Sequence, residues 1–261
     1  MSADEPIFTR EGDSFIPTAQ AVGPWDAGQL HGGAAGALVA GAIQALAPQM
    51  QLARLTLEFR GPVPLAPLQV DAEIVKPGGR LQLARAAISS GGRAALTATA
   101  TLLRRGEIEL PPQARWDAAI PVGPPDDPTH AGTPRDTPGF HTTGMTLRFA
   151  DGGGFDRLGP AQAWFALQRD LVAGEQMPAV CRAVAAADFS NGVSAVLDWG
   201  HWLFVNCDLT VTLLRDPASE WVLLDAITHI DRSGVGSASA QIFDEQGPIG
   251  LAQQTLFVAP H

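Results

Sequence analysis

Apolar and polar residues alternate in four stretches of the first 110 residues, and this period of two predicts β-strands. In the first stretch, Leu55, Leu57 and Phe59 would share one face of a sheet. The four stretches cover residues 55–60, 69–74, 80–89 and 93–103. Before them, residues 31–47 are rich in glycine and alanine, carry apolar side chains at helical spacing and end at Pro48. The pattern therefore predicts one buried helix followed by an antiparallel meander.

The same order of elements recurs in the second half of the chain. Residues 178–199 are predicted to be a helical region, and strand-like stretches follow at residues 206–214, 221–230, 235–244 and 248–258. Several landmarks repeat at an offset of about 155 residues, which indicates an internal duplication. Arg60-Gly61-Pro62 matches Arg215-Asp216-Pro217, Gly92 matches Gly247, and Leu96 matches Leu251.

Residues 111–140 differ in character from both halves. Eight prolines interrupt a polar stretch that has no sustained periodicity, which is typical of a linker or a long crossover. We therefore expect an N-terminal domain over residues 1–110, a linker over 111–140 and a C-terminal domain over 141–261.

Composition narrows the classes of function. The chain is 46% hydrophobic and has a net charge of −10, so it offers no basic surface for nucleic acid or an anionic membrane. Cys181 and Cys207 form neither a CxxC pair nor a zinc set, and they are interpreted as buried small hydrophobic residues in a reducing compartment. No signal-peptide pattern and no run of about 18 apolar residues occurs. We expect a cytoplasmic protein with neither a nucleic-acid nor a membrane partner.

A long helix wrapped by a curved antiparallel sheet is the hotdog architecture, and its duplication gives a double hotdog of the α+β class. The chain resembles the type II acyl-CoA thioesterase family in GQLHGGAAGALVAGAIQ and LTLEFRGPVPL of the first half, and in AAADFSN, NCDLTVTLLRDP and IGLAQQTLFV of the second. These segments are spread over most of the chain outside the linker. The resemblance implies a double hotdog fold, hydrolysis of acyl-CoA thioesters, and a homodimer or higher homo-oligomer.

Asp188 is the first catalytic candidate because it stands in a run of small apolar residues, AVAAADFSNG. A purely structural explanation is an N-cap or first-turn aspartate, stabilised by the helix dipole. Such a position would also keep the carboxylate ionised, so that it could hold and deprotonate a water molecule beside a thioester carbonyl. The two interpretations are compatible, and in the resembling family the aspartate that matches Asp188 acts in this way.

Two amides are candidates to hold the nucleophilic water beside Asp188. The resemblance matches Gln254, in AQQTLFV, with the family's water-orienting glutamine, and strand alternation sends Gln253 to the opposite face. It matches Asn206, in VNCDLT, with a position that is commonly threonine or asparagine. An amide both donates and accepts hydrogen bonds, which suits the positioning of a water or an acyl oxygen. Either residue could instead be an ordinary polar residue of a strand.

His31-Gly32-Gly33 opens the first predicted helix and supplies candidates for substrate binding. The glycines permit close approach of a ligand, and free backbone N–H groups at a helix start, near Gly33, can stabilise an oxyanion. Alternatively, the small residues Gly33, Ala37 and Gly41 simply let the helix pack closely on the sheet. His31 could line the site, cap the helix or bind a partner.

Other kinds of chemistry lack support in the sequence. There is no G-x-S-x-G nucleophile elbow, neither cysteine has a catalytic context, and the remaining histidines have no metal-site spacing. We therefore predict direct attack by water with Asp188 as general base, and neither a cofactor nor a metal.

Two further functions stay open. A hotdog dehydratase or hydratase would use His31 together with Asp188, although Ala35 and Ala40 stand where the dehydratase glycine and proline are expected. The hydratase run G-D-x-N-P-x-H is also absent. A non-catalytic acyl-CoA binding protein, or a purely structural dimerisation module, would keep the fold without turnover.

Overall fold

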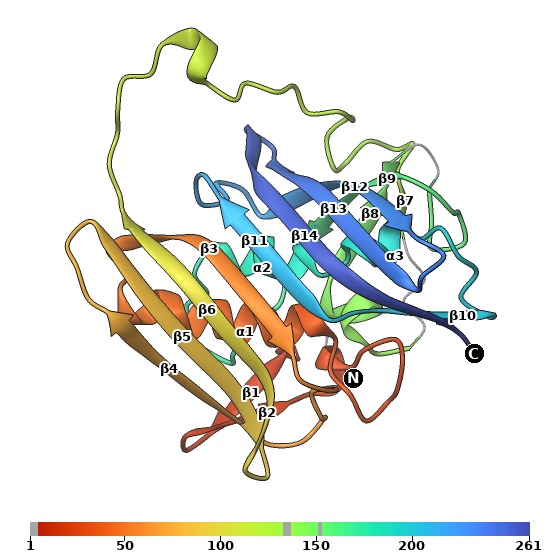
Figure 1. Ribbon diagram of the computed structural model, residues 1–261, viewed down its shortest axis with the longest axis horizontal. Coiled ribbons are helices and arrows are strands. Elements are labelled where there is room, and N and C mark those ends of the chain that lie inside the picture. The colour runs from red at the N-terminus through yellow and green to blue at the C-terminus, as the bar shows by residue number, and fades with distance from the viewer. Residues whose placement is uncertain (1–4, 133–136, 151–152) are drawn as a thin grey trace.

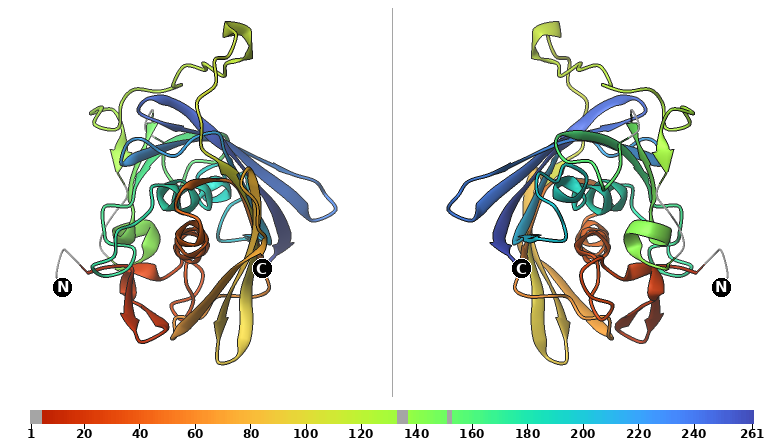
Figure 2. Two further views of the ribbon diagram at one scale, coloured as in Figure 1. Left: turned by 90° about the vertical axis from the view of Figure 1, so that its left-hand side faces the viewer. Right: turned by 90° about the vertical axis from the view of Figure 1, so that its right-hand side faces the viewer.

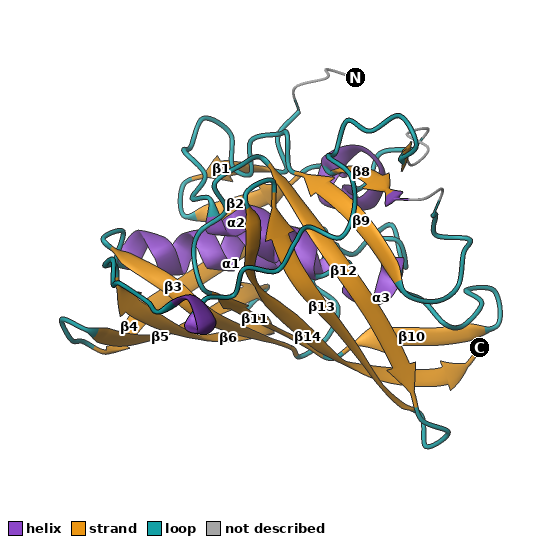
Figure 3. Ribbon diagram, turned by 90° about the horizontal axis from the view of Figure 1, so that it is seen from above, coloured by secondary structure: helices purple, strands orange, loops and turns teal. Residues whose placement is uncertain are grey.

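A single curved sheet dominates the structure and encloses the helices on its inner face (Figures 1 and 3). The computed structural model describes residues 5–132, 137–150 and 153–261. Within these ranges the fourteen strands form one sheet. None of the helices described there is both long enough and apolar enough to cross a membrane.

Each half contributes one group of long strands and a helix. The first half contains β1 (Phe8–Glu11), β2 (Ser14–Pro17), η1 (Ala19–Ala21), α1 (Gly32–Leu46), β3 (Met50–Phe59), β4 (Leu68–Lys76), β5 (Leu81–Ser90) and β6 (Arg93–Arg104). The connection contains η2 (Pro112–Ala114) and β7 (Ala131–Gly132). The second half contains η3 (Phe140–Gly144), β8 (Thr146–Phe149), β9 (Ala161–Ala166), α2 (Val180–Ala187), α3 (Ser190–Val193), β10 (Trp202–Asn206), β11 (Asp208–Leu213), β12 (Trp221–Ile230), β13 (Val235–Asp244) and β14 (Gly247–Pro260).

The sheet topology carries the duplication that the sequence predicts. The strand order β4-β5-β6-β3 of the first half recurs as β12-β13-β14-β11 in the second. The halves join through the antiparallel pair β3–β11, in which Thr56 lies opposite Thr210. A hydrogen bond of 3.1 Å between the two Oγ1 atoms lies at this seam. The two halves therefore join edge to edge through corresponding strands, as two copies of one unit would.

The predicted central helix and eight long strands correspond to α1, β3–β6 and β11–β14. The strands β1, β2, β8, β9 and β10 were not predicted, because they are short or lack a clear alternation. The predicted linker, residues 111–140, carries η2, β7 and the start of η3, and its residues 133–136 lie outside the described ranges. The predicted helical region 178–199 splits into α2 and α3, with the break at Asp188 and Phe189.

Helices α1 and α2 lie side by side inside the sheet (Figure 2), and their contacts show that they run in opposite directions. Gly33 at the start of α1 lies against Ala185 near the end of α2, and Gly41 lies against Cys181 at the start of α2. A Cβ at Gly33 would lie 2.6 Å from the Ala185 carbonyl oxygen, so only glycine fits there. The small residues of α1 thus allow close packing on another helix, which corrects the expectation of packing on the sheet alone.

Most of α1 is buried on every side, as expected for a helix that is apolar all round. Gly36 lies between the two layers, because a Cβ there would approach Leu57 of β3 and Val184 of α2. The sheet and α2 therefore fix α1 from opposite sides.

The helix contact predicts opposite effects for two glycine substitutions. We expect Gly33→Ala to lower the free energy of unfolding by about 1–3 kcal/mol, because the new methyl meets a backbone carbonyl that cannot move alone. Gly41→Ala is the matched control. Its Cβ would lie 3.4 Å from the Cys181 Sγ, so higher helix propensity should raise stability by about 0.5–1 kcal/mol. Urea unfolding measures both, and equal effects would contradict the proposed packing.

Candidate active site

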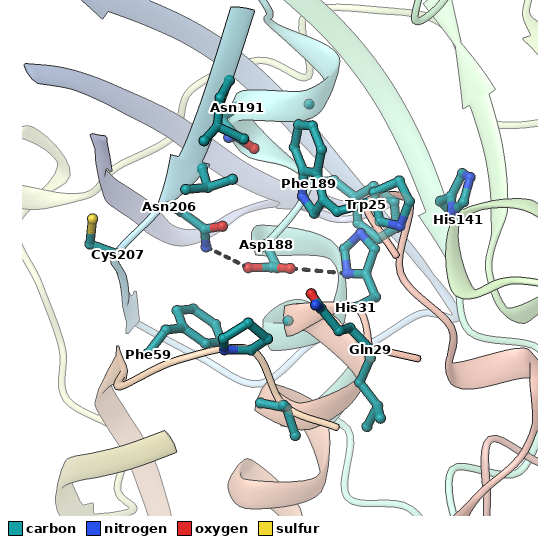
Figure 4. Close-up of a pocket in the computed structure, with 18 of the residues that line it drawn as sticks. Trp25, Gln29, His31, Phe59, His141, Asp188, Phe189, Asn191, Asn206 and Cys207 are labelled. Carbon is teal, nitrogen blue, oxygen red and sulfur yellow. Dashed lines mark hydrogen bonds and ion pairs between the residues drawn. The ribbon is translucent and has the colours of Figure 1, made fainter. Parts of the chain in front are cut away.

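A pocket of about 630 Å³ opens where the start of α1 meets the end of α2 (Figure 4). Its walls are mainly apolar and aromatic, and none of the described residues that line it is Lys or Arg. The apolar walls include Trp25, Leu30, Phe59, Val63, Phe155, Phe189, Trp199, Leu203 and Val205. Such walls with a few convergent polar groups are typical of a small-molecule site.

Asp188 lies at the C-cap of α2, not at a helix N-terminus as predicted from the sequence. The reason is that α2 precedes the aspartate and ends at Ala187. The positive helix end is supplied instead by α1, because a Cβ at Gly32 would lie only 2.7 Å from Asp188 Oδ2. The N-terminal dipole of one helix thus compensates the unfavourable position of an anion at the C-terminus of another.

Two side chains from different elements hold the Asp188 carboxylate. Asn206, the last residue of β10, donates from Nδ2 to Oδ1 at 2.8 Å, and His31 Nδ1 lies 3.0 Å from Oδ2. The side chain of Asp188 is only 4% exposed, so partners are required to offset the cost of burying a carboxylate. The structure thereby brings together three residues that the sequence singled out.

His31 is the N-cap of α1 and also lines the pocket. Its ring stacks on Phe189 with a centroid distance of 4.3 Å, and Phe140 lies on it at 5.1 Å. The Gly33 N–H donates to His31 Nδ1 at 3.0 Å. Gly33 and Asp188 therefore compete for one nitrogen, which accepts from Gly33 when unprotonated and donates to Asp188 when protonated.

The hydrogen bond from Gly33 to His31 distinguishes the two glycines that the sequence offers as oxyanion donors, Gly32 and Gly33. The Gly33 N–H is engaged by the N-cap, whereas the Gly32 N–H has no acceptor within the described part of the chain. Gly32 also lines the pocket. It is therefore the better placed of the two predicted glycines to meet a developing negative charge.

The structure does not bring Gln254 into the pocket. Its side chain is fully buried, donates from Nε2 to the backbone oxygen of Asp188 at 3.1 Å, and accepts from the Asn191 N–H at 3.0 Å. These two bonds bridge the break between α2 and α3. Gln254 thus holds the backbone that carries Asp188, while Gln253 is exposed on the other face of β14, as alternation predicted.

The two cysteines occupy different environments. Cys181 is buried as expected, and its burial raises the pKa of the thiol to about 12. The expectation that Cys207 is also buried is wrong, because it is exposed and lines the pocket directly after Asn206. Strand β10 ends at Asn206, and this places the next side chain at the pocket wall.

Three polar residues of the pocket, Gln29, His141 and Asn191, were not selected as site candidates from the sequence. Asn191 lies in the AAADFSN segment, and its side chain donates to the Phe204 carbonyl at 3.3 Å. Gln29 precedes His31 by two residues in GQLHGG, so adjacency to the motif was the available signal. His141, in η3, had no signal, because only the tertiary structure brings it to the pocket. Burial, and to a smaller extent the nearby His31, lower the pKa of His141 to about 4. No group of three or more potential metal ligands occurs among the described residues.

The fold and the pocket define a double hotdog protein with one acidic site between its halves. The family model "Acyl-CoA thioesterase N-terminal domain" matches residues 21–103, and "Acyl-CoA thioesterase C-terminal domain" matches residues 121–258. The chain therefore belongs to the acyl-CoA thioesterase family and is a thioester hydrolase. Comparison with curated protein sequences finds no match.

Solved structures show the same fold. A conserved protein with hot dog fold from Alicyclobacillus acidocaldarius aligns with a TM-score of 0.74 at 18% identity, over 97% of this chain and 95% of that one. The acyl-CoA thioesterase II TesB2 from Mycobacterium marinum aligns with a TM-score of 0.65 at 19% identity, over 88% and 90%. The dehydratase domain of the CurH module of curacin polyketide synthase reaches a TM-score of 0.50 at 13% identity, over 86% and 82%.

Removal of the Gln254 amide should destabilise the backbone that carries Asp188. We expect Gln254→Ala to lower the free energy of unfolding by about 2–4 kcal/mol, because two buried backbone groups lose their partners. Gln253→Ala, on the exposed face of the same strand, should change stability by less than about 0.5 kcal/mol. Denaturant unfolding of both variants checks this, and equal stability of the two would contradict a bridging role.

The lowered pKa of His141 predicts a specific dependence of stability on pH. Between about pH 6.5 and pH 4 the unfolded chain binds a proton that the folded chain does not, so stability falls as the pH falls. Allowing for partial exposure, this contribution should be about 1 kcal/mol between pH 7 and pH 5. We expect His141→Phe to remove it, whereas His229→Phe, at an exposed position of β12, should leave it unchanged. Urea midpoints at the two pH values give the test.

Proposed function

We propose that this thioesterase hydrolyses acyl-CoA to free acid and CoA by direct attack of a water molecule that Asp188 activates. The carrying observation is the buried Asp188 carboxylate in an apolar pocket, held by Asn206 and His31 and facing the start of α1. A carboxylate fixed in this way can accept a proton from a water molecule at the moment the water attacks. No covalent acyl-enzyme is required.

The reaction can be followed atom by atom. The water oxygen bonds to the thioester carbon while one water proton passes to Asp188. The carbonyl oxygen becomes an oxyanion, and the Gly32 N–H at the α1 start supports its charge. Collapse of the tetrahedral intermediate breaks the carbon–sulfur bond, and the proton on Asp188 goes to the thiolate. The carboxylate is then restored for the next cycle.

Asn206 and His31 would act on the orientation of the carboxylate. Asn206 fixes one oxygen by a 2.8 Å hydrogen bond, and His31 approaches the other at 3.0 Å. Because His31 can exchange Gly33 for Asp188 as its partner, it can donate to the carboxylate when it carries a proton on Nδ1. This arrangement holds the base in place without filling the pocket.

The walls of the pocket support an acyl substrate. Phe59 from β3 and Val205 from β10 lie on opposite halves of the fold, while Trp25 and Trp199 contact each other with a centroid distance of 5.2 Å. Burial of methylene groups against such walls contributes about 0.8 kcal/mol for each group. The acyl chain would therefore supply much of the binding energy.

The contact between His31 and Asp188 favours one second candidate. The two residues come from different halves and lie 3.0 Å apart, so they could act as a proton-transferring pair on an enoyl or 3-hydroxyacyl thioester. Such a dehydratase or hydratase would release no thiol. Loss of absorbance of the conjugated enoyl thioester distinguishes this reaction from hydrolysis.

Asp188→Asn tests the proposed base while keeping the size of the side chain. We expect kcat for thiol release from an acyl-CoA panel to fall by about 10²–10⁴-fold, because an amide cannot accept the water proton. Asp225→Asn, on β12 outside the pocket, serves as the matched control and should keep the activity of the unaltered enzyme. Retention of kcat by folded Asp188→Asn would rule out Asp188 as the base.

The proposal also includes the setting of the enzyme. Cys181 and Cys207 are free thiols, which suits a reducing compartment such as the cytoplasm. Exposed apolar side chains of β13 and β14, including Val235, Leu251 and Phe257, would suit a homodimer or higher homo-oligomer. Light scattering on the purified protein measures the oligomeric state.

A further inference from the structure

Gln29 lines the pocket together with Asp188, the proposed base, and His31. Its side-chain amide points toward Asp188 and His31 (Figure 4). The residue is half-buried, and its amide has no hydrogen-bond partner within the described part of the chain. It belongs to the segment that leads directly into α1.

Other glutamines with restricted exposure are bonded to the protein. Gln20 donates to Glu5 and accepts from Thr143, Gln44 bonds three backbone groups of the α1–β3 turn, and Gln254 bridges α2 and α3. Gln29 differs from this pattern although its amide is directed into the pocket. An amide that is held there without a protein partner is available to a ligand.

The backbone around Gln29 is fixed on both sides. The Gln29 carbonyl accepts from the Gly23 N–H at 2.9 Å, and the Leu30 N–H donates to the Val63 carbonyl at 2.8 Å. The His31 N–H donates to the Ala21 carbonyl at 2.9 Å. These hydrogen bonds fix the backbone of the segment that contains Gln29. The backbone therefore loses little conformational entropy when a ligand binds.

We propose that Gln29 Nε2 donates a hydrogen bond to the carbonyl oxygen of the thioester, beside the Gly32 N–H. This inference rests on the proposed function, because it assigns a second donor to the same reaction. Gln29 and Gly32 come from one segment of the first half, whereas Asp188 comes from the second half. A carbonyl placed between the halves meets donors on one side and the activated water on the other.

The neutrality of Gln29 suits this position. A lysine or arginine beside Asp188 would form an ion pair with the carboxylate and fill the space for water. A carboxylate would repel both Asp188 and the oxyanion. An amide supplies a donor without either effect, and the bond to the oxygen strengthens as negative charge develops in the transition state.

Steady-state kinetics of thiol release test the role of Gln29. We expect Gln29→Ala to lower kcat by about 10²-fold with KM changed less than about threefold, as for the loss of one oxyanion donor. Gln29→Glu should lower kcat at least as far, because it replaces the donor with an anion. Gln253→Ala, exposed on β14, is the matched control and should match the unaltered enzyme. Thermal unfolding of each variant verifies that it is folded.

A second readout reports on the carbonyl itself. The probe is a ¹³C-labelled ketone analogue of acyl-CoA, in which a methylene replaces the thioester sulfur, so that no hydrolysis occurs. Donation by Gln29 polarises the bound carbonyl and lowers its infrared stretching frequency. We expect a shift to higher frequency in Gln29→Ala and no shift in Gln253→Ala.

The outcomes separate this inference from the function on which it rests. The role of Gln29 alone would be overturned by the following result. The unaltered enzyme hydrolyses acyl-CoA, folded Gln29→Ala keeps a kcat within twofold of it, and the carbonyl band does not shift. Absence of thiol release from every acyl-CoA would overturn the proposed function, and the ketone probe would still decide whether Gln29 contacts an acyl carbonyl. A fall in kcat with an unshifted band would also refute donation to the carbonyl.

Discussion

The close antiparallel contact between α1 and α2 is the constraint on which the site depends. It brings the start of one helix to the end of the other, and it is possible because Gly33 leaves room for the Ala185 carbonyl oxygen. A wider separation of the helices would move His31 and Gly32 away from Asp188. The glycines at the start of α1 therefore set both the distance between α1 and α2 and the distance from the α1 start to the Asp188 carboxylate.

This contact also resolves an electrostatic conflict. Asp188 terminates α2, where the helix dipole disfavours an anion, and it is almost completely buried. The α1 start with its N-cap His31, and the Asn206 amide at the end of β10, together offset that cost. Gln254 holds the backbone at the same point, because its amide bridges the two short helices. The carboxylate is consequently fixed without losing its access to the pocket.

Duplication supplies two halves with similar topology but different helix ends. The α1 start and the α2 end form the pocket, whereas the opposite end of α1 is closed by Gln44, whose amide bonds the backbone of Ala47, Met50 and Leu52. At the Gln44 end the polar groups are hydrogen-bonded within the protein. At the pocket, the Gly32 N–H and the Gln29 amide remain available to a ligand. The halves thus differ at the pocket: the first contributes the start of α1 with Gly32, and the second contributes the Asp188 carboxylate.

The sequence alone determined the duplicated helix-and-meander order, because hydrophobic periodicity is local and the strands β3–β6 and β11–β14 alternate clearly. It also singled out Asp188, Asn206 and His31, since a polar residue in an apolar run or in a family-like motif is visible without coordinates. The tertiary structure decided which helix end faces Asp188, that Gln254 supports the backbone, and that Gln29, His141 and Cys207 line the pocket. Those relations depend on contacts between segments that are distant in the sequence. Helix packing and the β3–β11 pairing set the geometry of these contacts, and neither produces a periodic pattern in the sequence.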